Sequence, residues 1–187
     1  MGYVIPQNMR STINQRNGEL TIEIPVKRNW FILLFLSFWL CGWVLGEIMV
    51  PVMFFSKETQ GPPMLFAIAW LGMWTIGGGF AILIWLWQIN GKEIIRFTHN
   101  SLIKRKALFS FGRNKEFGLD YVKNLRISPQ SYNPFDFSSA LQFWGMGGGI
   151  IAFDYGAKTY RFGQCLDESE AKTIINNVNS HVNIPNE

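Results

Sequence analysis

Few residues in this chain carry the pattern of an enzyme active site. The two histidines, His99 and His181, have no nearby residues that would suggest a triad, a metal site or an acid–base pair. The two cysteines, Cys41 and Cys165, lack both a nucleophile motif and the spacing of metal ligands. Asp154 precedes a predicted turn, where an aspartate is common for structural reasons. We therefore expect no catalytic residue, metal or cofactor, and predict that the protein is not an enzyme.

Basic side chains suggest binding instead of catalysis. Lys104, Arg105 and Lys106 are consecutive in a predicted strand, where alternation puts the two lysines on one face and the arginine on the other. We expect a solvated sheet face beside an anionic membrane, and the alternative is a non-specific contact with lipid headgroups. The candidate membrane-surface contacts are Lys27, Arg28, Lys92, Lys104, Arg105 and Lys106.

One acidic residue, Glu47, stands inside a long apolar segment. A carboxylate within a membrane is a candidate for an ion or proton pathway. Counting from Trp30 at 1.5 Å per residue, Glu47 lies about 26 Å across, where it would reach headgroups or water. A transport role would also need an oligomer, because the only other polar groups noted are Ser37 and Thr75.

An aromatic segment, 135–146, is too apolar to be left in water at no cost. It packs over the folded domain, dips into the membrane interface, or receives a protein partner, and the sequence leaves these three alternatives open. Its candidate interface residues are Phe135, Phe137, Phe143, Trp144 and Met146.

The elements that carry these residues begin with two apolar runs, 30–55 and 64–89. Each exceeds the roughly 18 residues needed to cross a hydrocarbon core, so they predict a transmembrane hairpin. Of the 17 Lys and Arg residues, only Lys57 lies between the runs, which places both termini in the cytoplasm. This topology also accounts for the net charge of +4, and we expect no nucleic-acid partner.

Small residues in the two runs predict close helix packing. Gly42 and Gly46 have GxxxG spacing, and Gly77 and Gly78 lie on the second run within a triple glycine that allows a kink. The alternative use of these glycines is a dimer interface.

The remaining residues predict strands and one helix. Residues 1–18 are expected to form a polar tail, and residues 19–28 to hold the first strand, with Pro25 at an edge or at the strand's end. Residues 29–90 form the hairpin and 91–187 complete the domain. The expected later strands are 93–99, 102–109, 115–119, 121–128, 150–155 and 158–162, with a turn at 111–114. Asp167 and Glu170 predict a capping box for a helix over 167–182.

Seven strands and a C-terminal amphipathic helix predict a pleckstrin-homology-like β-barrel. The transmembrane hairpin would be inserted between its first and second strands, giving a membrane α+β protein. The first strand would then pair with a strand that follows the hairpin.

The chain resembles a family of bacterial two-span membrane proteins with a cytoplasmic pleckstrin-homology-like domain. The resemblance covers most of the chain after Gly18. The residues that carry it are 18–25, 27–30, 144–149, 151–156, 160–163 and 166–171. It implies a fold and a location in the cytoplasmic (inner) membrane, without implying a reaction.

We therefore expect a membrane-anchored docking or assembly module with a membrane or membrane-proximal protein partner. Recognition would use a groove, a loop, or a strand added to an open sheet edge. The alternatives are a sensor of anionic lipid or of the membrane surface and, as a third class, a subunit of a transport complex. The oligomeric state is left open.

Overall fold

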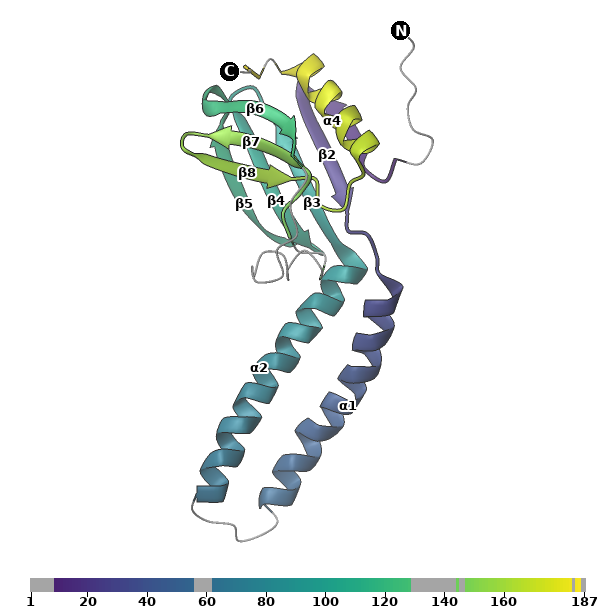
Figure 1. Ribbon diagram of the computed structural model, residues 1–187, viewed down its shortest axis with the longest axis vertical. Helices are drawn as coiled ribbons and strands as arrows, with labels where there is room; N and C mark the ends of the chain where they lie inside the picture. The colour runs from purple at the N-terminus through teal and green to yellow at the C-terminus, as the bar shows by residue number, and fades with distance from the viewer. Residues whose placement is uncertain (1–8, 56–61, 129–143, 145–146, 183, 186–187) are drawn as a thin grey trace. The chain divides into compact units, whose positions relative to one another are not determined.

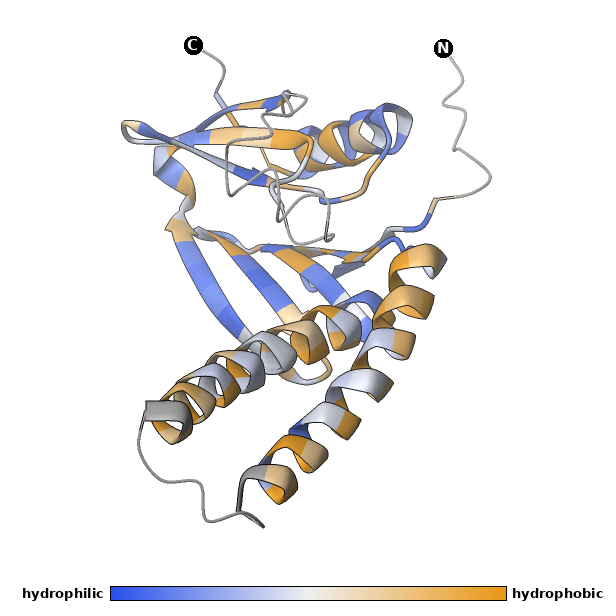
Figure 2. Ribbon diagram, turned by 60° about the horizontal axis from the view of Figure 1, so that its bottom comes forward, coloured by the Kyte–Doolittle hydropathy of each residue, from blue (hydrophilic) through white to orange (hydrophobic). Residues whose placement is uncertain are grey.

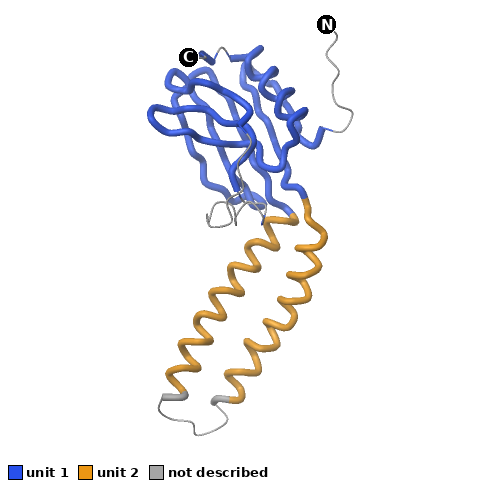
Figure 3. Tube along the Cα trace, viewed as in Figure 1, with its two compact units in different colours: residues 1–27, 90–187 blue, residues 28–89 orange. Residues whose placement is uncertain are grey.

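The computed structural model describes residues 9–55, 62–128, 144, 147–182 and 184–185. Its described residues form an α+β fold with three α-helices and two antiparallel sheets (Figure 1). The chain divides into two compact units, which Figure 3 shows in different colours. We call residues 1–27 and 90–187 the globular unit, and residues 28–89 the helical unit.

The larger sheet of the globular unit has its strands in sequence order, each antiparallel to the next. Its strands are β1 (Thr12–Arg16), β2 (Glu19–Pro25), β3 (Gly91–Phe97), β4 (Ser101–Leu108) and β5 (Phe111–Gly118). Buried positions alternate with more exposed ones along β2 and β3, and Figure 2 shows both hydrophobic and hydrophilic residues in the strands. Alternation gives the sheet one face that can be buried and one that can be solvated.

The predicted pairing across the apolar segment is present. Strand β2 pairs with β3, with Ile22 opposite Ile95 and Thr21 opposite Arg96. Both isoleucines are fully buried. Residues separated by the whole helical unit therefore share one core.

The smaller sheet and a helix complete the globular unit. A short 3-10 helix, η1 (Leu119–Tyr121), leads into β6 (Val122–Ile127), followed by β7 (Ile151–Tyr155) and β8 (Lys158–Phe162) in the order β6-β7-β8. Helix α4 (Glu168–His181) begins after Asp167, whose carboxylate accepts a hydrogen bond from the Glu170 N–H at 2.7 Å. The predicted N-cap is thus confirmed.

Helix α4 and both sheets contribute to a common core. Ala171, Ile174 and Val178 are spaced to lie along one side of the helix, and all three are fully buried. The fully buried residues of the sheets include Ile22, Ile95, Phe97, Leu102, Val122, Ile151, Phe153 and Phe162. The helix therefore supplies the apolar stripe that its periodicity predicts.

The helical unit consists of α1 (Trp30–Phe55) and α2 (Pro62–Asn90). The segments Trp30–Met53 and Met64–Asn90 are long and apolar enough to cross a membrane. Most of their large apolar side chains are exposed, such as Phe38 and Met73. Helix α2 runs without a break through Gly77–Gly79, where the triple glycine allowed a kink.

The expectation of a polar tail over residues 1–18 is wrong for Thr12–Arg16, which form β1. Asn17 and Gly18 join β1 to β2 with φ values of 53° and 77°. Both residues of a tight hairpin turn need positive φ, and Asn-Gly is the favoured pair. Strand β2 consequently lies between β1 and β3, and Pro25 occupies its end, not an edge.

The predicted seven-stranded barrel also needs correction. The described residues form eight strands in two sheets that do not close on each other. The turn expected at 111–114 belongs to β5, and the chain reverses at Phe109 and Ser110. Because Leu108 pairs with Phe111, the β4–β5 loop has only two residues.

The expected capping box forms in part. The Glu170 carboxylate is buried and accepts hydrogen bonds from the N–H and the hydroxyl of Ser11, at 2.7 and 2.8 Å. This pair joins the segment before β1 to α4. Strand β1 itself pairs with β2 along all five of its residues.

Candidate functional site

A basic groove of about 840 Å³ lies between β4 and β5 of the larger sheet and β8 of the smaller sheet. Among the described residues that line it, five side chains are cationic and one is a carboxylate. The lining consists of Lys104, Lys106, Arg113, Asn114, Lys115, Glu116, Gly147, Gly148, Thr159, Tyr160 and Arg161. We call this feature the basic groove.

Strand alternation brings the cations of β4 and β5 together. Lys104 and Lys106 share a face of β4 with Leu102, which is fully buried between the sheets. Lys115 lies directly opposite Lys104, and Arg113 directly opposite Lys106. Like charges directly opposite each other destabilise a sheet. Two such pairs side by side concentrate positive charge, which an anionic group could offset.

The two lysines do share a face, but that face is not the solvated one we expected. The Lys104 side chain is 17% exposed, because the inner face of β4 looks toward the smaller sheet. Its ammonium also donates a hydrogen bond to the carbonyl oxygen of Arg161 on β8. Alternation assigned the residues to a common face correctly, and the packing of the second sheet decided which face it was.

A buried carboxylate lies behind the groove. Glu93 on β3 is only 3% exposed, and its Oε1 is 3.1 Å from the Lys104 Nζ. Its Oε2 accepts hydrogen bonds from the N–H groups of Gly163 at 2.9 Å and Gln164 at 3.2 Å. The sequence analysis missed this residue. Glu93 lies two residues before Ile95 and therefore on the same face of the strand. Because Ile95 is buried, this spacing was the available signal that Glu93 is buried too.

The Lys106 ammonium of the groove is partly withdrawn from water. Burial lowers the pKa of Lys106, the negative charge of Glu93 opposes this effect, and the positive charge of Lys104 reinforces it. The Lys106 Nζ donates to the carbonyl oxygen of Gly147 at 3.2 Å. An anion in the groove would favour the charged form of this lysine.

Aromatic and hydroxyl groups orient two of the three remaining cations. The Lys115 ammonium lies over the Tyr160 ring, 5.0 Å from its centroid. The Arg161 guanidinium donates to the Ser128 hydroxyl at 3.0 Å. These contacts order the cationic side chains before any ligand arrives, which lowers the entropic cost of binding.

The other candidate membrane-surface residues do not join this groove. Lys92 forms an ion pair with Glu23 at 3.1 Å, with both side chains about two-fifths exposed. The Arg105 guanidinium donates to the carbonyl oxygen of Ser110 at 2.6 Å, and Lys27 is exposed. The six basic residues therefore lie on different faces, and two of them contribute to the groove.

In the helical unit, the glycines differ in their surroundings. A Cβ at Gly78 would lie 2.0 Å from the Trp43 ring, and one at Gly46 would lie 3.7 Å from Trp74. At Gly42 and Gly77 a Cβ would meet nothing within 4 Å among the described atoms. Gly78 and Gly46 thus lie where the two helices pack together.

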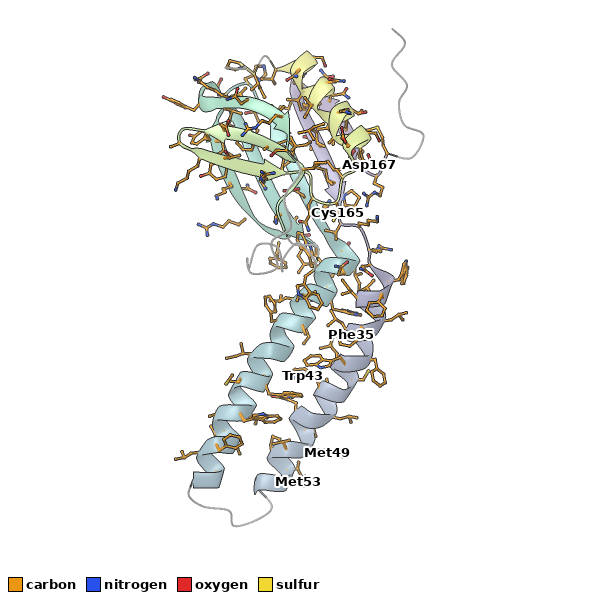
Figure 4. The ribbon with its side chains drawn as sticks, in the orientation of Figure 1. Phe35, Trp43, Met49, Met53, Cys165 and Asp167 are labelled. Carbon is orange, nitrogen blue, oxygen red and sulfur yellow. The ribbon has the colours of Figure 1, made fainter. Side chains whose placement is uncertain are left out.

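Polar contacts also join α1 and α2. The Trp43 Nε1 donates to the carbonyl oxygen of Trp74 at 3.1 Å, and Figure 4 shows Trp43 on the side of α1 that faces α2. The Thr75 hydroxyl donates to the Glu47 Oε1, while the Glu47 Oε2 is buried without a partner among the described residues. Glu47 is thus tied to the neighbouring helix.

The two residues before α1 contact the last turn of α2. The Arg28 guanidinium donates to the carbonyl oxygen of Ile89 at 3.2 Å. The Asn29 N–H donates to the Gln88 Oε1 at 3.3 Å. The candidate residue Arg28 therefore belongs to the helical unit and has a partner within it.

The candidate interface residues of the aromatic segment 135–146 fall mostly outside the part of the chain that the structure describes. Phe135, Phe137, Phe143 and Met146 lie outside the described residues. Trp144 lies in a turn and is partly buried. The three alternatives for this segment stay as predictions.

A second hollow, of about 540 Å³, lies beside β6 and the β7–β8 turn. Its centre is Asp154, which accepts hydrogen bonds from Arg126 at 2.6 and 3.1 Å and from Thr159 at 2.7 Å. These bonds lower the pKa of Asp154 to about 2. The carboxylate is thereby committed to structure and is a poor proton acceptor near neutral pH.

The chemistry available in the basic groove is the binding of an anionic group. Among the described residues, no cluster of three or more His, Cys, Asp or Glu side chains could hold a metal ion. No family model matches the chain, and no curated protein or solved structure matches it. The basic groove and the two apolar helices are therefore the features that bear on function.

Proposed function

We propose that the protein is a membrane-anchored, non-enzymatic docking module. In this proposal the helical unit crosses the bacterial cytoplasmic membrane twice, and the globular unit lies in the cytoplasm. The basic groove then binds an acidic segment of a membrane or membrane-proximal protein. The observation that carries the proposal is two pairs of opposed cations on a sheet face that lines the basic groove. These pairs are Lys104 with Lys115 and Lys106 with Arg113.

Two features support the membrane anchor. The exposed side chains of α1 and α2 are largely apolar, which is unfavourable in water and favourable in lipid. Lys57 is the only Lys or Arg between the two runs, whereas 16 of 17 lie outside them. The positive-inside rule then favours cytoplasmic termini.

The pairing of β2 with β3 explains why such an anchor would suit docking. The last residues of β2 and the first of β3 are neighbours in the sheet, with Pro25 opposite Lys92. The globular unit is thus tethered by two adjacent strands. Tethering raises the local concentration of the groove for a partner in the same membrane.

The pleckstrin-homology-like interpretation of the globular unit is part of this proposal. Its support is the succession of antiparallel strands in two sheets followed by one C-terminal helix. The open space between the sheets, which a closed barrel would lack, is where the basic groove lies.

Site-specific photo-crosslinking in intact membranes tests the proposal. A photoreactive residue at Asn114 lies in the groove, and one at Lys172 lies on the exposed side of α4. We expect a discrete protein adduct from position 114 and none from position 172. The adduct should disappear in the Arg113→Glu/Lys115→Glu variant because the groove then repels acidic groups.

A matched variant, Lys123→Glu/Lys158→Glu, changes the net charge equally but outside the groove, and should keep the adduct. Loss of the adduct in both variants would contradict the proposal, because general electrostatics would then suffice. Adducts with phospholipid alone would contradict protein docking and support the alternative of an anionic-lipid sensor.

A further inference from the structure

The turn between β4 and β5 exposes two phenylalanines. Phe109 is 52% exposed and Phe111 is 83% exposed, and only Ser110 separates them. Neither side chain belongs to the core of the globular unit. Two large aromatic side chains at the tip of a two-residue hairpin loop are costly in water.

The backbone of this turn is also unusual. Phe109 has a φ of 55°, in the left-handed region where a bulky residue is an outlier. The β1–β2 turn uses Asn17 and Gly18 at such positions, and the β7–β8 turn uses Gly156 with a φ of 58°. Phe109 therefore costs backbone strain and leaves half of its side chain in water, so it does not stabilise the fold. Strain of this kind is concentrated at functional sites.

The strand register gives the position of the tip within the globular unit. Leu108, next to Phe109, lies opposite Gly91, the first residue of β3. Gly91 directly follows Asn90, where the apolar segment Met64–Asn90 ends. Neighbouring strands are about 4.8 Å apart and rise about 3.3 Å per residue, so the Phe109 backbone lies within about 10 Å of Gly91.

The length of the apolar segment gives the position of Gly91 relative to a bilayer. The 27 residues of Met64–Asn90 rise about 40 Å as a helix. The hydrocarbon core together with both headgroup regions is about 40–45 Å thick. A helix that crosses it therefore delivers Gly91 to the headgroup layer, and the strand register keeps the Phe109 backbone within about 10 Å of that residue.

Charged groups beside the tip complement an anionic surface. The Arg105 guanidinium donates to the Ser110 carbonyl oxygen, and Lys92 is the second residue of the neighbouring strand β3. Phenylalanine is among the residues that interfacial segments bury at the boundary between headgroups and acyl chains, and basic side chains favour anionic headgroups. The combination of exposed aromatics with flanking cations fits a lipid surface better than a protein groove.

We propose that Phe109 and Phe111 insert into the headgroup region of an anionic bilayer. They form a third membrane contact of the protein, in addition to the two chain crossings, and limit how the globular unit turns over the membrane. This inference rests on the proposed two-span hairpin, because only that hairpin brings the bilayer to Gly91. The docking of a partner in the basic groove does not depend on it.

Spin labels on the full chain in nanodiscs test the contact. A Cys41→Ala/Cys165→Ala background carries one label, either by Phe111→Cys at the tip or by Ala157→Cys at the β7–β8 turn. The nanodiscs contain phosphatidylglycerol and phosphatidylcholine. We expect the label at 111 to be relaxed mainly by oxygen, and the label at 157 mainly by a water-soluble nickel chelate. Equal relaxation of both labels by the chelate would overturn the proposal.

A second variant separates insertion from misfolding. With the label at position 110, Phe109→Gly/Phe111→Ser should raise relaxation by the chelate several-fold, because the tip loses its apolar side chains. Glycine fits the positive φ of position 109, so the turn should still form. Unchanged relaxation would show that the phenylalanines do not make the contact, and would overturn the proposal.

Two further results keep the proposals distinct. Release of the chain from membranes by alkaline carbonate would contradict the two-span hairpin itself. An integral chain whose label at 111 is relaxed freely by the chelate would overturn only the tip contact. Protection of position 111 in native membranes but not in nanodiscs would show that a protein covers the tip, which also overturns it.

Discussion

The contribution of the buried Glu93 carboxylate can be measured against an exposed pair of the same kind. Glu93 with Lys104 and Glu23 with Lys92 both have nitrogen–oxygen distances of 3.1 Å. Their side chains are 3% and 17% exposed in the first pair, and 39% and 40% in the second. Glu93→Ala and Glu23→Ala therefore remove the same chemical group at the same separation but at different burial.

The expected costs differ because of the groups left behind. Glu93→Ala leaves the Lys104 ammonium without its counter-charge and removes the acceptor of two N–H groups, those of Gly163 and Gln164. Removing one partner of a buried pair costs about 3–5 kcal/mol. Because Lys104 keeps some exposure and its bond to Arg161, we expect the lower end, about 3 kcal/mol. Glu23→Ala should cost about 0–1 kcal/mol.

Hydrogen exchange measured by mass spectrometry on the full chain in nanodiscs is the appropriate assay. Exchange of the core amides of β3 and β7 reports the free energy of unfolding of the globular unit. A loss of about 3 kcal/mol corresponds to a decrease in protection of roughly 100-fold. Glu23→Ala should leave protection of the same amides within roughly fivefold of the wild type.

Glu93→Gln separates charge from hydrogen bonding. Its carbonyl oxygen still accepts from one or both N–H groups, so the expected cost is about 1–2 kcal/mol. If Glu93→Ala cost no more than Glu23→Ala, burial would not strengthen this pair and the reasoning would be refuted. If Glu93→Ala and Glu93→Gln lowered the free energy of unfolding equally, the hydrogen bonds from Gly163 and Gln164 would not contribute to stability.

Three further predictions follow from the geometry. The pKa of Asp154 is lowered in the folded state from 3.8 to about 2. Asp154 therefore stabilises the globular unit above about pH 4, and this stabilisation is lost as the pH falls toward 2. Asp154→Asn should accordingly flatten the dependence of the urea unfolding midpoint on pH over that range. Gly78→Ala should displace the Trp43 ring and shift its indole N–H resonance, at a cost of about 1–3 kcal/mol, whereas Gly77→Ala should leave that resonance in place. Because burial lowers the pKa of Lys106 from 10.5, the affinity of the groove for polyglutamate measured by calorimetry should begin to fall at a lower pH in the wild type than in Lys106→Arg, whose guanidinium stays charged. Identical pH profiles would contradict this prediction.

Local periodicity was sufficient for the elements that bury one side. Alternation of Leu20, Ile22 and Ile24 predicted β2, and the apolar spacing of 171–178 with Asp167 before it predicted α4. Each pattern is strong because half of the side chains enter the core. Strand β1 was missed because only Ile13 of its five residues is even partly buried, which leaves no alternation to detect.

The turn of the β4–β5 hairpin was misplaced for a related reason. Gly112 and Asn114 have the residue types of a turn, whereas the observed turn contains Phe109 and Ser110. Local turn preference therefore failed at the position where the backbone is strained. Local rules are expected to fail at such sites when function competes with folding.

The sequence by itself determined the two apolar helices, the strand on either side of them, and the capped C-terminal helix, because each depends on residues close together in the chain. Only the tertiary structure decided that Lys104 and Lys106 face inward, that Arg161 from β8 joins them, and that Glu93 neutralises one of their charges. Periodicity shows that residues share a face, but the position of a second sheet determines whether that face meets water, core or a groove. Such packing depends on contacts between residues far apart in sequence, which no local pattern contains.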